Sequence, residues 1–274
     1  MKMNMNENTK MQKLYTTLAL RMAKLMKRKD ALITVATLVG GLVSPLSASA
    51  AISSPSKGTA LTSVPNLGKP LHPPAHGPVQ VAFIIGPDLV SIDLFGPMAA
   101  FGDASMTSDM MGSPRFNMYA VAATTEPLDL GGLTIQPQYS FASAPQPNVL
   151  VVPMQKSLPA TIAYVRKTSA HADVTMSICT GAFLVAKAGL FDGLRATTHH
   201  SGYDDFEKWF PKVTLVRGPK YVENRNVSSS GGESSGIDLA LRVVERYYGA
   251  DAARDAAYNM EYRRTQRPQS RNDV

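Results

Sequence analysis

The sequence has only one cysteine, and only 18% of its residues are charged. A single cysteine excludes a disulfide within the chain and a zinc site built on a cluster of thiolates. The low charge accompanies 44% hydrophobic residues, a proportion typical of a globular protein. A length of 274 residues is sufficient for one sizeable domain or two small ones with a buried core.

The body of the protein also lacks a strong charge of one sign. Residues 1–30 contain eight Lys and Arg against two acidic residues, so they carry +6 of the total net charge of +7. Only +1 remains for residues 31–274. Nucleic-acid binding usually requires a basic surface, so we expect no nucleic-acid partner.

The basic segment begins a predicted secretory signal peptide over residues 1–50. An apolar run, ALITVATLVGGLV at 31–43, precedes SPLSASA, in which Ala48 and Ala50 are the small residues that a signal peptidase reads. We expect cleavage after Ala50, a periplasmic or secreted protein, and no stable membrane insertion, because spanning a bilayer takes roughly 20 residues. The alternative is an uncleaved anchor. No cysteine lies near the cleavage point for a lipid anchor, and the lack of paired arginines favours general secretion.

Residues 51–78 are rich in Ser, Pro and Gly and have no hydrophobic periodicity, which predicts a flexible linker. Its histidines, His72 and His76, fit incidental linker residues better than metal ligands. We predict a folded domain over residues 79–262 and a polar C-terminal tail over 263–274.

Short apolar runs recur along this domain and are typical of buried parallel strands. These runs are VQVAFII (79–85), FNMYAVAA (116–123), VLVVP (149–153) and VTMSI (174–178). Segments with helical spacing separate them, and helices are predicted over 181–188, 235–247 and 251–262, with a small hairpin at 128–138. This alternation predicts an α/β fold with a mainly parallel central sheet and helices on both faces.

The single cysteine, Cys179, lies between the predicted strand 174–178 and the predicted helix 181–188. This position resembles a nucleophile elbow, where unpaired backbone N–H groups and the helix dipole favour a thiolate, so we expect a lowered pKa. A side chain at Gly181 would crowd such a turn. An exported protein with an unpaired cysteine also favours a reactive thiol. The alternative is a buried cysteine that acts as a small hydrophobe.

Four segments together resemble the ThiJ/PfpI superfamily of class I glutamine-amidotransferase-like folds. They are VAFIIGPDLVSIDLFGPMAAF (81–101), SICTGAFLVAKAGLFDGLRATTH (177–199), SSSGGESSGIDLALRVVERYYG (228–249) and NMEYR (259–263). The resemblance covers residues 79–262 and is greatest to the isonitrile hydratase branch and the ligand domains of some AraC-type regulators. It implies a flavodoxin-like three-layer sandwich and a homodimer.

The resemblance also implies site residues: Cys179 as nucleophile, Asp93 as a neighbouring carboxyl group, Thr180 as a supporting hydroxyl and backbone donor, and His199 as a nearby imidazole. In an isonitrile hydratase, the thiol would add to the isonitrile carbon while Asp93 moves protons, and an N-substituted formamide would leave. Each residue has a structural alternative. Asp93 caps a turn before a helix that begins near Pro97, Thr180 only starts a helix, and His199 is polar surface.

The chain departs from the family pattern at three positions. Met154 and Gln155 stand where the family usually has two glycines, which puts an oxyanion-binding role of that loop in doubt, and His200 replaces a more usual aromatic residue. No cofactor and no metal are expected, since no further Cys or His has ligand spacing.

Two classes of function follow. One is a cysteine-dependent hydratase or lyase of a small electrophile. The other is a non-catalytic module that binds a small ligand or senses oxidants through its thiol, without a DNA-binding domain.

Overall fold

A computed structural model describes residues 68–109, 114–130 and 132–264 of the protein. The predicted signal peptide, most of the linker and nearly all of the C-terminal tail lie outside these residues. No helix in the described ranges is long and apolar enough to cross a membrane.

The centre of the fold is a seven-stranded sheet with the order β10-β11-β7-β6-β1-β2-β5. All neighbouring strands are parallel except β10 and β11. The strands are β1 (Val79–Ile84), β2 (Phe116–Ala122), β5 (Tyr139–Ser140), β6 (Val149–Val152), β7 (Val174–Ser177), β10 (Tyr221–Glu223) and β11 (Val227–Ser230). Two short pairs lie outside it, β3 (Leu128–Asp129) with β4 (Thr134–Ile135) and β8 (Arg195–Ala196) with β9 (Thr214–Leu215).

The four apolar runs of the sequence form β1, β2, β6 and β7, as predicted. The central strands β6 and β7 are buried along their whole length, because helices cover both faces and leave no side for polar residues. The predicted hairpin at 128–138 is the antiparallel pair β3–β4.

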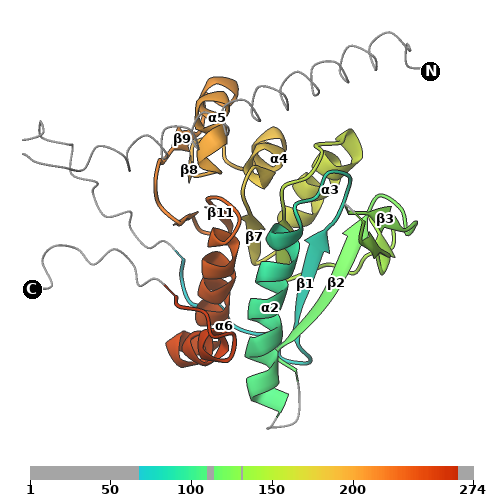
Figure 1. Ribbon diagram of the computed structural model, residues 1–274, viewed down its shortest axis with the longest axis vertical. Coiled ribbons are helices and arrows are strands. Elements are labelled where there is room, and N and C mark those ends of the chain that lie inside the picture. The colour runs from blue at the N-terminus through green and yellow to red at the C-terminus, as the bar shows by residue number, and fades with distance from the viewer. Residues whose placement is uncertain (1–67, 110–113, 131, 265–274) are drawn as a thin grey trace, which may run out of the picture. The chain divides into compact units, whose positions relative to one another are not determined.

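Helices cover the sheet in two layers (Figure 1). The helices α2 (Ser91–Asp109) and α6 (Ser235–Asn259) lie side by side on one face. The other face is covered by α3 (Pro159–Ser169), α4 (Gly181–Lys187), and α5 (Tyr203–Trp209), which follows the short 3-10 helix η1 (His200–Gly202). Alternate residues of β1 enter the two cores, with Phe83 in the first and Ile84 in the second. The predicted three-layer, mainly parallel α/β fold is therefore confirmed.

The helix that carries Asp93 begins at Ser91 rather than near Pro97, so the expected start is wrong. Pro97 lies inside α2 and removes one backbone N–H from the helix. Packing against α6 compensates for this loss, and at Gly96 a Cβ atom would lie 2.9 Å from Cγ1 of Ile237. The two helices predicted at the C-terminus are joined in α6 across a kink at Gly249, whose φ is 86°.

The start of the described chain is fixed to α6, although it lies within the predicted linker. The buried Arg242 donates from Nη2 to the Gly68 carbonyl over 3.1 Å, and the buried Arg246 donates from Nε to the Lys69 carbonyl over 2.9 Å. The Leu71 N–H donates to the Arg246 carbonyl over 2.7 Å. Residues 68–71 are thus part of the packed structure.

Candidate active site

Cys179 lies at the carboxyl edge of the sheet, between β7 and α4. Its φ is 55°, a left-handed conformation that non-glycine residues rarely adopt and that costs on the order of 1–3 kcal/mol. Two hydrogen bonds hold the turn: the Cys179 N–H donates to the Gly231 carbonyl over 3.0 Å, and Thr198 Oγ1 donates to the Cys179 carbonyl over 2.9 Å. The sulfur is therefore held in one place by segments from distant parts of the chain.

Gly181 allows α4 to approach the end of β6. A Cβ atom there would overlap the Val152 carbonyl oxygen and would lie 2.8 Å from the Pro153 carbonyl oxygen. Backbone atoms cannot move aside as a flexible side chain can, so a larger residue would displace the turn. The predicted need for glycine at this position is thus explained by β6 rather than by the turn alone.

Asp93 lies in the first turn of α2 and is completely buried. Its Oδ2 accepts a hydrogen bond of 3.1 Å from the Met154 N–H, whereas its Oδ1 has no partner among the described residues. Burial raises the pKa of Asp93 from 3.8 to about 7; the Met154 N–H opposes this shift and the nearby Glu233 carboxylate adds to it. Near neutral pH this carboxyl group can therefore both donate and accept a proton.

The pKa of Cys179 is raised, so the expected lowering is wrong. Burial is the main cause, and the negative charge of Asp93 raises the pKa further. Backbone N–H groups of Thr180 and Glu233 donate to the sulfur and lower the pKa, while the Glu233 carboxylate raises it again. The helix dipole was the feature visible in the sequence, but the depth of burial outweighs it.

Thr180 directly follows Cys179, whereas His199 follows Thr198, whose hydroxyl donates to the Cys179 carbonyl. Thr180 supplies the predicted backbone donor, while its side chain makes no capping hydrogen bond. His199 Nδ1 accepts from the Ser201 N–H over 3.3 Å and lies 2.7 Å from Ser201 Oγ. That ring packs against Gly232, where a Cβ atom would lie 2.9 Å from Nε2. In the described structure its hydrogen bonds are with Ser201, and none joins it to Cys179 or Asp93.

Met154 and Gln155 form the loop after β6, where the sequence lacks the expected glycines. The Met154 N–H is already occupied by Asp93. Gln155 is buried, donates from Nε2 to the Ile84 carbonyl over 3.0 Å, and fills the space above Gly86. The loop therefore positions the Asp93 carboxyl group instead of offering this N–H to an anionic intermediate.

Two contributors to the site were missed in the sequence. Thr198 holds the Cys179 turn, and Glu233 lies at the bend before α6 with a φ of 29°. Thr198 could have been noticed, because it stands in the ATTH segment beside His199. Glu233 gives no signal, since it lies in a run of Ser and Gly without periodicity. No group of three His, Cys, Asp or Glu side chains within residues 68–109, 114–130 and 132–264 could hold a metal ion.

Comparison with known proteins gives consistent results. A model of the DJ-1/PfpI family matches residues 79–246. An isonitrile hydratase of Pseudomonas putida is 27% identical over 190 residues, which are 67% of this chain and 78% of that protein. The HTH-type transcriptional regulator CdhR of Pseudomonas aeruginosa is 31% identical over 101 residues, 37% of this chain but only 30% of the regulator.

A solved structure of a ThiJ/PfpI family protein from Pseudomonas syringae has the same fold. It superimposes with a TM-score of 0.59 at 25% identity and covers 81% of this chain and 86% of that one.

Proposed function

The chain belongs to the DJ-1/PfpI family, and within this family we propose that it is a cysteine-dependent hydratase of a small electrophile such as an isonitrile. One observation carries the proposal: a fully buried carboxyl group with a pKa of about 7 and one unpartnered oxygen lies beside the sulfur of Cys179. General acid–base catalysis is most efficient when the pKa of the group is near the working pH. The 27% identity to an isonitrile hydratase supports the choice of substrate class.

The proposed reaction has two stages. First, the sulfur of Cys179 forms a bond to the terminal isonitrile carbon, and the thiol proton passes through the Asp93 carboxylate to the same carbon, which gives a thioimidate. Water then adds to that carbon: Asp93 takes a proton from the water and passes it to the nitrogen, which leaves a hydroxyl group on the carbon. The carbon–sulfur bond breaks, the N-substituted formamide leaves, and the remaining proton returns to the sulfur.

The raised pKa of Cys179 is compatible with this sequence because Asp93 provides the base. Ionised Asp93 takes the thiol proton as the new bond forms, so no free thiolate has to exist beforehand. The N–H groups of Thr180 and Glu233 then stabilise the sulfur when it leaves as an anion.

The test is the appearance of formamide from simple alkyl and aryl isonitriles. We expect turnover by the unchanged protein, none by Cys179→Ala, and a loss of about 10²- to 10⁴-fold in kcat for Asp93→Asn. Asp88→Asn is the matched control, because this exposed aspartate lies on the adjacent loop. Full activity of Cys179→Ala would refute the proposal.

A second candidate is a module that binds a small ligand without turnover. It is favoured by the loop after β6, whose Met154 N–H is occupied by Asp93 and is not free for an anionic intermediate. Saturable binding that persists in Cys179→Ala, without any product, would support this role. An oxidant sensor is less favoured, because burial raises the pKa of its thiol.

We also propose that the protein is exported and that residues 1–50 are removed. The support is the order of basic segment, apolar run and small residues in the sequence. Mass spectrometry of the protein from fractionated cells should find a chain that begins at Ala51 outside the cytoplasm. A cytoplasmic chain that retains Met1 would contradict this proposal.

A further inference from the structure

Glu233 occupies the bend between β11 and α6, next to the sulfur of Cys179. Its backbone N–H donates to that sulfur, and the carbonyl of the preceding Gly231 accepts the Cys179 N–H over 3.0 Å. The φ of 29° at Glu233 and the hydrogen bond from the Gly236 N–H to its carbonyl, 3.1 Å long, hold the bend in place. The main chain of Glu233 is thus fixed at the site while its side chain is exposed.

The Glu233 carboxylate is exposed and forms no ion pair with another described residue. It has no hydrogen bond or ion pair in the described part of the chain. Lys220, whose carbonyl accepts the Gly231 N–H, already directs its amino group to Asp238 over 2.6 Å. The charge of Glu233 also acts on the interior, because it raises the pKa of both Asp93 and Cys179.

Two further features point to a ligand beside this carboxylate. Oδ1 of Asp93 is a buried acceptor without a partner in the described structure, so a bound group can donate to it. Apolar side chains lie on the two neighbouring helices: Ile92 and Phe95 on α2 are 37% and 41% exposed, and Ile237 at the start of α6 packs against Gly96 of α2. The exposed Glu233 carboxylate therefore lies at the bend that contacts the sulfur, with apolar side chains on α2 and at the start of α6.

We propose that Glu233 selects the charge of the substrate, so that the site favours isonitriles whose substituent combines an apolar body with a cationic end, such as an ammonium group, and rejects anionic ones. This inference concerns the substrate class and rests on the proposed hydratase function. Glu233 acts on the approach to the sulfur and takes no part in bond making. Opposite charges at the rim of a partly buried site are weakly screened, so one carboxylate has a measurable effect.

The experiment compares two thiol reagents of similar size and opposite charge. The trimethylammonium-ethyl and sulfonatoethyl methanethiosulfonates both transfer their thioalkyl group to the sulfur and release methanesulfinate, so no turnover is needed. Rates are divided by those for free N-acetylcysteine and are all measured at one pH, near pH 8. Because both reagents react with the same thiolate, a change in the pKa of Cys179 cancels from the ratio.

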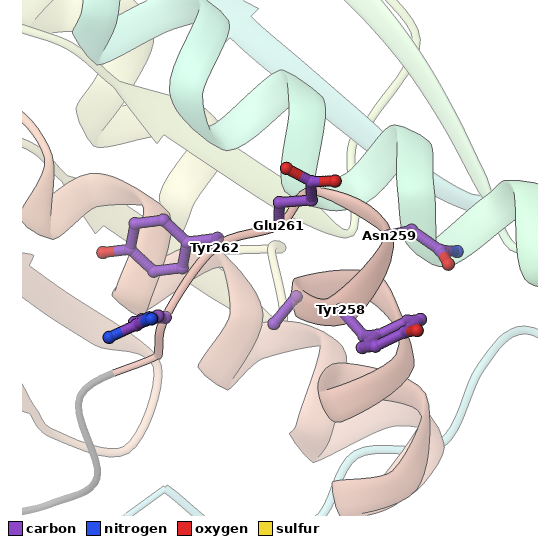
Figure 2. A pocket seen from close by; sticks show the side chains of 6 residues that line it. Tyr258, Asn259, Glu261 and Tyr262 are labelled. Atoms are coloured by element: carbon purple, nitrogen blue, oxygen red, sulfur yellow. The ribbon is translucent and has the colours of Figure 1, made fainter.

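We expect the cation-to-anion ratio to exceed that of the free thiol and to fall about tenfold in Glu233→Gln, roughly threefold for each reagent. Glu233→Lys should reverse the preference. The matched control is Glu261→Gln, because Glu261 is also an exposed glutamate in a left-handed conformation, with a φ of 49°. It lines an open hollow at the C-terminal end of α6, together with Tyr258, Asn259 and Tyr262 (Figure 2).

Each outcome decides the proposal. An unchanged ratio in Glu233→Gln overturns it, and so does failure of both reagents to modify Cys179, because Glu233 then does not border an open route to the sulfur. An equal change in Glu261→Gln overturns it as well, since the effect then belongs to net charge. If the ratios behave as expected but no isonitrile is hydrated, the hydratase function fails and the charge preference of the site remains. Where hydration occurs, kcat/KM for an ammonium-bearing isonitrile should fall relative to a carboxylate-bearing one in Glu233→Gln.

Discussion

Replacement of Asp93 by asparagine should stabilise the protein in neutral and alkaline solution at the expense of activity. The native state holds the Asp93 proton with a pKa of about 7, whereas the unfolded chain has a pKa near 3.8. Well below pH 3.8 the carboxyl group is protonated in both states, so its ionisation does not reduce the stability of the fold. The cost grows as the pH rises from 3.8 towards 7, because the unfolded chain releases this proton first.

The shift of about three pKa units corresponds to about 4 kcal/mol of lost stability above pH 7. Between about pH 5 and pH 8 the cost increases by roughly 2–3 kcal/mol. Asparagine does not titrate, so its stability carries no such dependence on pH. Its amide nitrogen would take the place of Oδ1, which has no partner among the described residues. A buried donor without an acceptor lowers the unfolding free energy by an amount that does not vary with pH. The unfolding free energy of Asp93→Asn relative to that of the unchanged protein should thus rise by roughly 2–3 kcal/mol from about pH 5 to pH 8.

Urea unfolding at both pH values measures this difference, with the fluorescence of Trp209, the single tryptophan, as the signal. Asp88→Asn serves as the control, because it makes the same chemical change at an exposed side chain. If Asp93→Asn differs from the unchanged protein by the same free energy at both pH values, the carboxyl group titrates normally and the proposed acid–base role loses its basis.

Three further experiments test the packing of the site and the coupling between Asp93 and Cys179. Gly181→Ala should destabilise the protein by about 2 kcal/mol or more in the same urea assay, because its Cβ would overlap the Val152 carbonyl, whereas Gly102→Ala, with its nearest contact at 3.8 Å, should be neutral or stabilising. Cys179→Gly should be about 1 kcal/mol more stable than Cys179→Ala, since only glycine is unstrained at a φ of 55°; equal stabilities would show that the turn is relaxed. The pH at which iodoacetamide modifies Cys179 at half its maximal rate should fall in Asp93→Asn, because a negative charge that raises the thiol pKa is removed; an unchanged midpoint would contradict the coupling.

The strands and the position of Cys179 could be predicted because their signals are local. Runs such as 149–153 and 174–178 are uniformly apolar, and only a strand covered on both faces requires that pattern. The place of Cys179 between strand and helix follows from the same runs. The need for glycine at position 181 can be predicted for a similar reason, since a strand followed at once by a helix leaves little space for a side chain at the turn.

The electrostatics of the site could not be predicted, because they arise from residues far apart in the chain. The burial that raises the pKa of Cys179 depends on α2 and on the bend at Glu233, and neither is adjacent to it in sequence. Pro97 suggested a helix start, but the packing of α2 against α6 allows the proline inside the helix. The Met154 N–H that holds Asp93 is a backbone group, and no choice of side chain reveals it.

The attachment of residues 68–71 to α6 has a practical consequence for work with this protein. The family match begins at Val79, so an expression clone trimmed to that boundary would lack Gly68, Lys69 and Leu71. The guanidinium groups of Arg242 and Arg246 on α6 would then lose the carbonyls of Gly68 and Lys69 as hydrogen-bond acceptors. The same helix begins just after the bend whose backbone N–H donates to the sulfur of Cys179. Weak activity in a trimmed protein would therefore reflect the loss of contacts that hold α6 rather than a wrong substrate. Screening should start from the chain with residues 68–71 intact.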